Sequence, residues 1–136
     1  MLRGPAAGGR VAAVARADVI DVALVALRAA AEVAASGDRT RHDDATYALT
    51  GPQALTLDEV AEIISRLTGR PTRYEPETIE QAYASRSGVG AESWQVDAWV
   101  STYTAIAAGE LAEVTDDVPR LTGHPATSLQ QLLGGS

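Results

Sequence analysis

Apolar and polar positions follow their clearest pattern between residues 46 and 76, where they predict a strand, a helix and a second strand. The apolar run 47–49 is typical of a short strand, and Gly51 and Pro52 follow it as a turn signal. Five apolar residues then recur at the spacing of one helical face: Leu57, Val60, Ala61, Ile64 and Leu67. A second short strand is expected at 72–74. Nothing in this unit is chemically reactive, so we interpret it as architecture.

The two ends of the predicted helix carry their own signals. Thr56 precedes the helix and Glu59 comes three residues later, which is the spacing of a capping box. Gly69 is expected to end the helix in the left-handed conformation, and Pro71 prevents its continuation. The helix is therefore predicted to lie between these two caps.

Before this unit, the pattern predicts a strand and a long helix. Residues 1–10 are rich in glycine, proline and alanine without periodicity, which indicates a loop or a ragged end. The apolar run 11–15 is expected to form a buried strand. Asp18 is a candidate N-cap for a helix that runs to about Ala35. Because this helix is apolar on nearly every side, we expect it to be buried on most of its faces.

Residues 77–136 are predicted to be mainly helical. Helical signals cover 77–87, 92–111, 115–122 and 128–133, with a glycine-marked break after the first of them. The whole chain of 136 residues suits a single domain with one core.

Both tryptophans lie in the predicted helix 92–111. Its apolar stripe is typical of a core-facing helix, and Trp99 and Tyr103 lie one above the other on the same face. Trp94 is offset from Trp99 by about 140°. We therefore expect Trp99 in the core and Trp94 at the mouth of a cleft. In the alternative interpretation, all three aromatic residues line a pocket for a flat or apolar ligand.

Composition excludes several classes of function. The net charge of −7 argues against sequence-independent nucleic-acid binding, and no apolar run is long enough to span a membrane. The chain has no cysteine, which suits the cytoplasm and excludes thiolate chemistry. All eleven basic residues are arginine, so sites that need a lysine are excluded. His42 lies beside Asp43 and Asp44, but adjacent loop residues converge poorly on one ion. We predict neither a metal site nor a catalytic residue.

Three blocks of the chain resemble successive blocks from the C-terminal half of NmrA-like proteins, which are atypical relatives of the extended short-chain dehydrogenases and include NAD(P)H:quinone reductase-like members. The blocks are GRVAAVARADVIDVA, TYALTGPQALTLDEVAEIISRLTGRPTRY and AIAAGELAEVTDDVPRLTGHPATSLQQLL. The resemblance implies a helix-rich α/β fold: a C-terminal, substrate-side lobe with short parallel strands that lacks the N-terminal Rossmann half. It also implies that 11–14 pairs with 72–74 in a small sheet, and that 47–49 is an outer strand of the nucleotide-binding sheet with an unpaired edge.

The chain departs from this family at its start. Members begin with a strand and a Gly-x-Gly-x-x-Gly turn, which holds the dinucleotide pyrophosphate. Gly4, Gly8 and Gly9 do not have that spacing. No cofactor-binding residue is therefore carried over, and NAD(P)H is implied only for full-length relatives.

Three functions agree with these observations. The chain is expected to be the substrate-side portion of an NAD(P)H-dependent oxidoreductase for a quinone or similar small apolar substrate, inactive alone, with Trp94, Trp99 and Tyr103 bordering the cleft. The alternatives are a non-enzymatic redox-sensing regulator and a small independent ligand-binding module. The implied partners are a small apolar substrate and either a second copy or a chain that supplies the Rossmann half, but no nucleic acid and no membrane.

Overall fold

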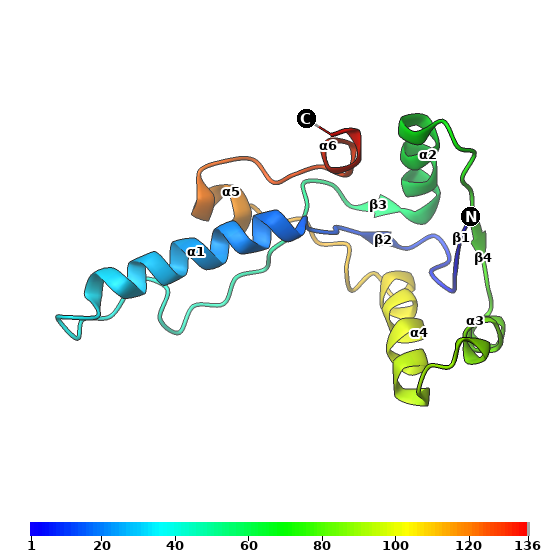
Figure 1. The fold of residues 1–136 in the computed structure, drawn as a ribbon, viewed down its shortest axis with the longest axis horizontal. Coiled ribbons are helices and arrows are strands. Elements are labelled where there is room, and N and C mark those ends of the chain that lie inside the picture. Colours follow the sequence, from blue (N-terminus) through cyan, green and yellow to red (C-terminus); the bar gives the residue numbers. More distant parts are fainter. Residues whose placement is uncertain (136) are drawn as a thin grey trace.

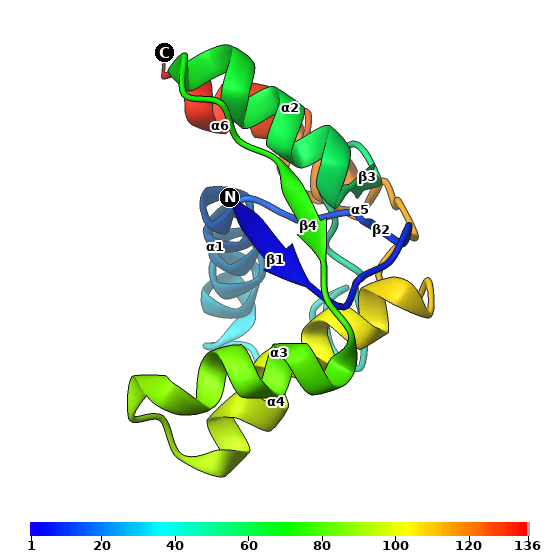
Figure 2. The same ribbon diagram turned by 90° about the vertical axis from the view of Figure 1, so that its right-hand side faces the viewer.

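Two pairs of short strands lie among helices in the computed structural model, which describes residues 1–135 (Figures 1 and 2). The elements in chain order are β1 (Leu2–Gly4), β2 (Arg10–Val11), α1 (Arg16–Val33), β3 (Leu55–Thr56), α2 (Leu57–Thr68), β4 (Tyr74–Pro76), α3 (Ile79–Arg86), the 3-10 turn η1 (Ser87–Val89), α4 (Ser93–Ala107), α5 (Asp117–Thr122) and α6 (Leu129–Gly134). Within these residues, no helix combines the length and the apolar character that crossing a membrane requires.

The strands form two separate sheets. β1 pairs with β4 in parallel, with Leu2 opposite Tyr74. β2 pairs with β3 in antiparallel orientation, with Val11 opposite Leu55. The predicted class, a helix-rich α/β fold with short parallel strands, is confirmed.

Several strand predictions were wrong. Residues 1–10 were expected to be a loop, but they contain β1 and the first residue of β2. Val11 does not pair with 72–74, because β3 is its neighbour and β1 is the neighbour of β4. The run 47–49 forms no strand: the N–H of Ala48 donates to the Asp117 carboxylate (2.7 Å), and its carbonyl accepts from the Thr115 hydroxyl. Side chains therefore take the place of a neighbouring strand at Ala48.

The predicted caps of α2 are confirmed. The Thr56 hydroxyl accepts the N–H of Glu59 (3.2 Å), and the Glu59 carboxylate accepts the N–H of Thr56 (2.8 Å). Gly69 ends the helix with a φ of 68°, in the left-handed region that favours glycine. The Arg10 guanidinium also binds both oxygens of Glu59, at 3.0 and 3.2 Å. The start of α2 is thereby joined to β2.

The start of α1 differs from the prediction. The helix begins at Arg16, and Asp18 is not its cap but a buried residue of its first turn. The Asp18 carboxylate accepts the N–H (2.7 Å) and the hydroxyl (2.9 Å) of Thr127. Asp18 therefore joins α1 to the segment before α6. Only one face of α1 is buried, so the expectation that most of its faces are covered was wrong.

Three small apolar clusters replace the single core that the composition suggested. The buried residues of the first are Ala6, Ala61, Tyr74 and Ile106; of the second, Val22, Val118 and Ala126; and of the third, Ala82, Val96 and Val100. In the first cluster, the Tyr74 hydroxyl donates to the carbonyl of Gly4 (2.6 Å) and accepts the N–H of Ala6 (3.1 Å). Burial raises the pKa of Tyr74, so this hydroxyl stays protonated as a donor.

Replacing Thr56 by alanine tests the cap of α2. The change removes the hydroxyl that accepts the N–H of Glu59, so the free energy of unfolding should fall by about 1 kcal/mol. Chemical denaturation measures it. An unchanged midpoint at an unchanged slope would show that the hydroxyl does not stabilise the helix.

Candidate functional site

A hollow of about 480 Å³ lies between the start of α2, the end of α3 and one side of α4. Its lining residues are Leu57, Arg86, Trp99, Thr102, Tyr103 and Ile106. Two aromatic rings and one guanidinium thus meet at a single open surface, which we name the aromatic shelf (Trp99, Tyr103 and Arg86). Pockets for small molecules are rich in aromatic side chains with a few polar groups, and this hollow has that composition.

Helix α4 presents its tryptophans differently from the prediction. Val96 and Val100 form its buried stripe and pack near Ala82 of α3. Trp99 lies at the edge of this stripe, with 44% of its surface exposed, so the expectation that it packs in the core was wrong. The physical reason is size, because the closely packed contact between α3 and α4 is filled by alanine and valine. An indole is accommodated only beside that contact.

Trp94 is 66% exposed and does not line the hollow. It lies about 160° around the helix from Val96, on the solvent side. The structure therefore brings together Trp99 and Tyr103 but not Trp94. A contact of any of the three with a substrate stays a prediction.

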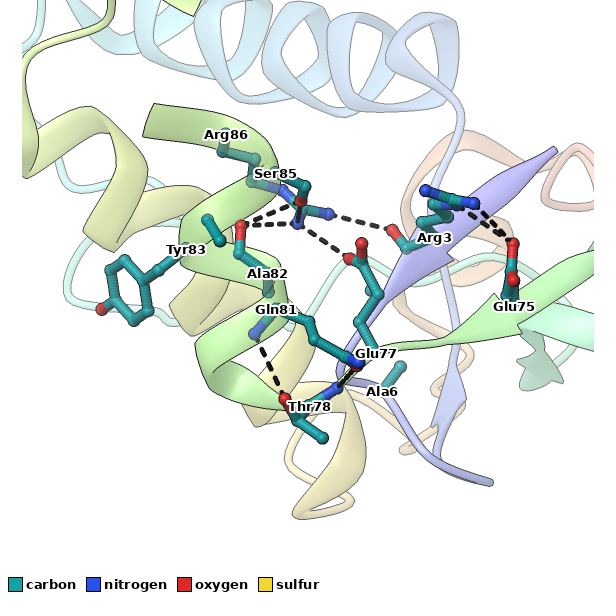
Figure 3. A network of polar contacts seen from close by, with 12 residues as sticks. Arg3, Ala6, Glu75, Glu77, Thr78, Gln81, Ala82, Tyr83, Ser85 and Arg86 are labelled. Atoms are coloured by element: carbon teal, nitrogen blue, oxygen red, sulfur yellow. Dashed lines mark hydrogen bonds and ion pairs between the residues drawn. The ribbon is translucent and has the colours of Figure 1, made fainter. Parts of the chain in front are cut away.

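Arg86 holds the shelf in place through contacts with β1, with its own helix α3 and with the turn before α3 (Figure 3). Its Nη1 donates to the Glu77 carboxylate (2.9 Å) and to the carbonyl of Ala82 (2.9 Å), and its Nη2 donates to the carbonyl of Arg3 in β1 (3.0 Å). The side chains of Arg86 and Glu77 are only 17% and 8% exposed. This largely buried ion pair fixes the guanidinium in one position.

The guanidinium carbon of Arg86 lies 5.4 Å from the centre of the Tyr103 ring, which is cation–π distance. The ring also lies against Gly4, where a Cβ atom would lie 2.3 Å from a ring carbon. Tyr103 is therefore in contact with both Arg86 and Gly4. The shelf is preorganised before any ligand arrives.

Sequence reasoning missed Arg86. An arginine in the last turn of a helix is common, because it complements the helix dipole, so nothing marked this one as special. The only local signal was Glu77, nine residues earlier. Arg3 and Arg86 are 83 residues apart in the sequence, so their contact left no local signal.

A second hollow, of about 250 Å³, lies on the other side of Leu57, between the β2–β3 pair, α2 and α6. Its lining is almost entirely aliphatic: Val11, Ala13, Val14, Ala15, Pro52, Gln53, Leu55, Leu57, Val60, Leu129 and Leu132. Leu57 belongs to both hollows, so an aromatic surface and an aliphatic surface adjoin at the start of α2. An aliphatic lining can hold an apolar group but gives it little orientation.

The residues around the shelf suit binding better than chemistry. The Thr102 hydroxyl donates to the carbonyl of Ala98 (3.0 Å). Among the described lining residues, no hydroxyl is hydrogen-bonded to a carboxylate or an imidazole, as an activated nucleophile would be.

Both histidines are engaged with the protein itself. His42 Nδ1 lies 2.9 Å from the hydroxyl of Tyr47. Asp18, Asp21 and His124 come within 4.8 Å of one another, but Thr127 occupies both oxygens of Asp18, and His124 bonds the carbonyl of Pro125 (2.9 Å) and Asp21 (3.2 Å). We interpret this cluster as a joint between α1 and the chain before α6.

Comparison with known proteins shows that the chain is similar to part of an NAD(P)H azoreductase and to part of a quinone oxidoreductase. The chain is 37% identical to the NAD(P)H azoreductase of Xenophilus azovorans over 114 residues, which are 84% of this chain and 37% of that protein. It is 26% identical to quinone oxidoreductase 2 of Escherichia coli over 94% of this chain and 41% of that protein. No family model matches the chain.

The fold agrees with these similarities. The crystal structure of the Citrobacter sp. triphenylmethane reductase complexed with NADP(H) superposes with a TM-score of 0.75 at 25% identity, over 95% of this chain and 42% of that one. The chain thus spans about two fifths of the length of the relatives it matches. The resemblance to NAD(P)H-linked oxidoreductases is supported, and the relationship covers part of those proteins only.

Two isosteric substitutions compare the buried ion pair with an exposed one. Glu77→Gln leaves the Arg86 guanidinium buried without its counter-charge and should lower the free energy of unfolding by about 3 kcal/mol. Glu75→Gln breaks a pair whose side chains are 48% and 44% exposed, so its effect should stay below about 1 kcal/mol. Urea denaturation of both variants measures the difference. Equal effects would mean that Arg86 does not depend on Glu77.

The joint at His124 predicts a pH dependence. The bond to the Pro125 carbonyl, helped by Asp21, raises the pKa of His124 above its usual 6.5. The stability from this joint should therefore be complete below pH 6.5 and decline as the pH rises through the raised pKa. Melting temperatures of the wild type and His124→Asn between pH 5.5 and 8.5 give the comparison. An advantage of the wild type that grows with pH would contradict the assignment.

Proposed function

We propose that this chain is the substrate-side portion of an NmrA-like, NAD(P)H-dependent oxidoreductase whose substrate is a quinone or a similar small, flat, apolar molecule. The observation that carries the proposal is the aromatic shelf, found in a chain that aligns with part of an NAD(P)H azoreductase. A flat ring would stack against Trp99 beside Tyr103, while the aliphatic hollow beyond Leu57 would receive apolar substituents.

The nucleotide would be bound outside these 136 residues. The N-terminal glycines do not fit a pyrophosphate site, because a Cβ atom on Gly9 would lie 2.0 Å from the carbonyl oxygen of Ile106 and Gly4 abuts Tyr103. These glycines serve close packing of the protein against itself. The chain alone is then inactive, and a separate nucleotide-binding portion supplies the hydride donor. A cytoplasmic location, with which the absence of cysteine agrees, belongs to the same proposal.

One observation favours the non-enzymatic alternative, a redox-sensing regulator. The described residues around the shelf contain no activated acid, base or nucleophile. A regulator would use the same surfaces to bind without turnover. Turnover of NADPH with a quinone separates the two functions.

The proposal is tested with the chain alone and with the chain joined to the nucleotide-binding portion of a relative. Titration of NADPH fluorescence with the chain alone should show no saturable binding, and the joined protein should oxidise NADPH with 1,4-naphthoquinone. Trp99→Ala should raise KM about tenfold with little change in kcat, because it removes a stacking surface. Trp94→Ala should change KM by less than about twofold, because Trp94 lies outside the hollow.

Two results would overturn the proposal. Micromolar binding of NADPH by the chain alone would show that the cofactor site is here after all. Equal effects of Trp94→Ala and Trp99→Ala on KM would show that the shelf does not contact the substrate.

A further inference from the structure

Three of the four tyrosine hydroxyls in this chain are bound by the protein itself. They belong to Tyr47, Tyr74 and Tyr83, whose partners are His42, the backbone of Gly4 and Ala6, and Asp97. The hydroxyl of Tyr103 differs from these three. Within residues 1–135, no hydrogen bond joins it to another group. A ligand on the aromatic shelf therefore does not have to displace a protein partner from this hydroxyl.

The Tyr103 hydroxyl is open to solvent, although the residue as a whole is half-buried. Among the described residues, the buried side-chain oxygen or nitrogen atom that lacks a partner is Oε1 of Gln130. A buried Tyr103 hydroxyl would be a second such atom, so this hydroxyl is accessible. The open surface that Tyr103 lines is the hollow beside Leu57 and Trp99. The hydroxyl is therefore a donor that a ligand in the hollow can reach.

The ring that carries this hydroxyl is held in one position. The guanidinium carbon of Arg86 lies 5.4 Å from its centre, and ring carbons fill the space beside Gly4. Arg86 is in turn fixed by Glu77 and by the carbonyl of Arg3. A hydroxyl on a fixed ring selects a ligand atom by its place, because no side chain has to be ordered when the ligand binds.

Most other polar groups of the hollow are already bound. The Thr102 hydroxyl donates to a carbonyl of its own helix (3.0 Å). The Arg86 guanidinium donates to four oxygens, which belong to Glu77, Ala82, Ser85 and the backbone of Arg3. Because Glu77 balances the charge of Arg86 at 2.9 Å, the hollow does not require an anionic ligand. The indole N–H of Trp99 is the competing donor, on a side chain that is 44% exposed.

We propose that the Tyr103 hydroxyl donates a hydrogen bond to a carbonyl oxygen of the substrate, and that this bond selects neutral flat rings that carry such an oxygen. This inference rests on the proposed function. The ring would lie on Trp99 with its oxygen at Tyr103, which is an arrangement that a quinone can adopt. A flat hydrocarbon offers no acceptor. A cationic ring would lie beside Arg86 with no carboxylate among the described lining residues. Tyr103 is thus a specificity-determining residue.

The test compares 1,4-naphthoquinone with naphthalene, which has the same fused rings without the two oxygens. Their binding to the chain alone is measured without cofactor, by NMR titration of the amide signals. Tyr103→Phe should weaken the binding of 1,4-naphthoquinone about five- to tenfold, because it removes one hydrogen bond, and it should leave the binding of naphthalene unchanged. The chain has no cysteine and no lysine, so it lacks the side chains that most readily add to a quinone.

Two further variants serve as controls. Tyr83→Phe removes a hydroxyl that bonds Asp97 outside the hollow, so it should bind both molecules like the wild type. Trp99→Phe removes the competing N–H but keeps an aromatic ring, so it should change both affinities by the same factor. Tyr103→Phe should also keep the wild-type midpoint of urea denaturation, because its hydroxyl has no partner within residues 1–135.

Three results would overturn the role of Tyr103. They are no binding of 1,4-naphthoquinone by the wild-type chain, the same loss of affinity for both molecules in Tyr103→Phe, and a lowered denaturation midpoint in that variant.

The proposed function fails separately, in the protein joined to a nucleotide-binding portion. Selective loss of 1,4-naphthoquinone binding in Tyr103→Phe, without oxidation of NADPH by the joined protein, supports the role of Tyr103 and removes the oxidoreductase assignment. Turnover with a KM that Tyr103→Phe leaves unchanged supports the oxidoreductase and removes the role of Tyr103.

Discussion

The passage of residues 2–11 between α2 and α4 is the constraint on which the rest of this structure depends. The Tyr74 hydroxyl holds this segment by donating to the carbonyl of Gly4 and accepting the N–H of Ala6. Without it, these two backbone groups would be buried without partners. Ala6 is completely buried beneath it. Gly9 then crosses the end of α4 so closely that any side chain would overlap the carbonyl of Ile106. Small residues at these points let one chain segment contact two helices at once.

The same segment determines the shape of the aromatic shelf. Gly4 leaves the space that the Tyr103 ring fills, and the carbonyl of Arg3 receives the guanidinium of Arg86. Because Arg86 also pairs with Glu77, the orientation of the ring is coupled to β1, to α3 and to the turn between β4 and α3. The glycines at the chain start therefore allow the close packing that surrounds the aromatic shelf. Close packing explains why positions 4 and 9 are glycine, and no phosphate-binding role is needed to explain them.

The sequence predicted contacts between residues that are close together in the chain and missed contacts between residues that are far apart. The capping box of Thr56 and Glu59 spans three residues, so its pattern is complete within one helical turn and the structure reproduces it. β1 has three residues and a partner about 70 positions away, so no periodicity could show it. Asp18 has the sequence signature of a cap, but its partner Thr127 lies 109 residues later. For the candidate site, periodicity placed Trp99 and Tyr103 on one face but could not show that alanine and valine would take the core positions.

The apolar pattern of α1 predicts more burial than the structure provides. Its apolar residues surround the whole helix, which is the composition of a segment buried on every side. The described residues 1–135 cover one side of α1, through Val22 and its small cluster. Ile20, Leu24 and Leu27 therefore stay exposed on a helix whose sequence is typical of a buried segment, and this exposure is a source of instability in the isolated chain.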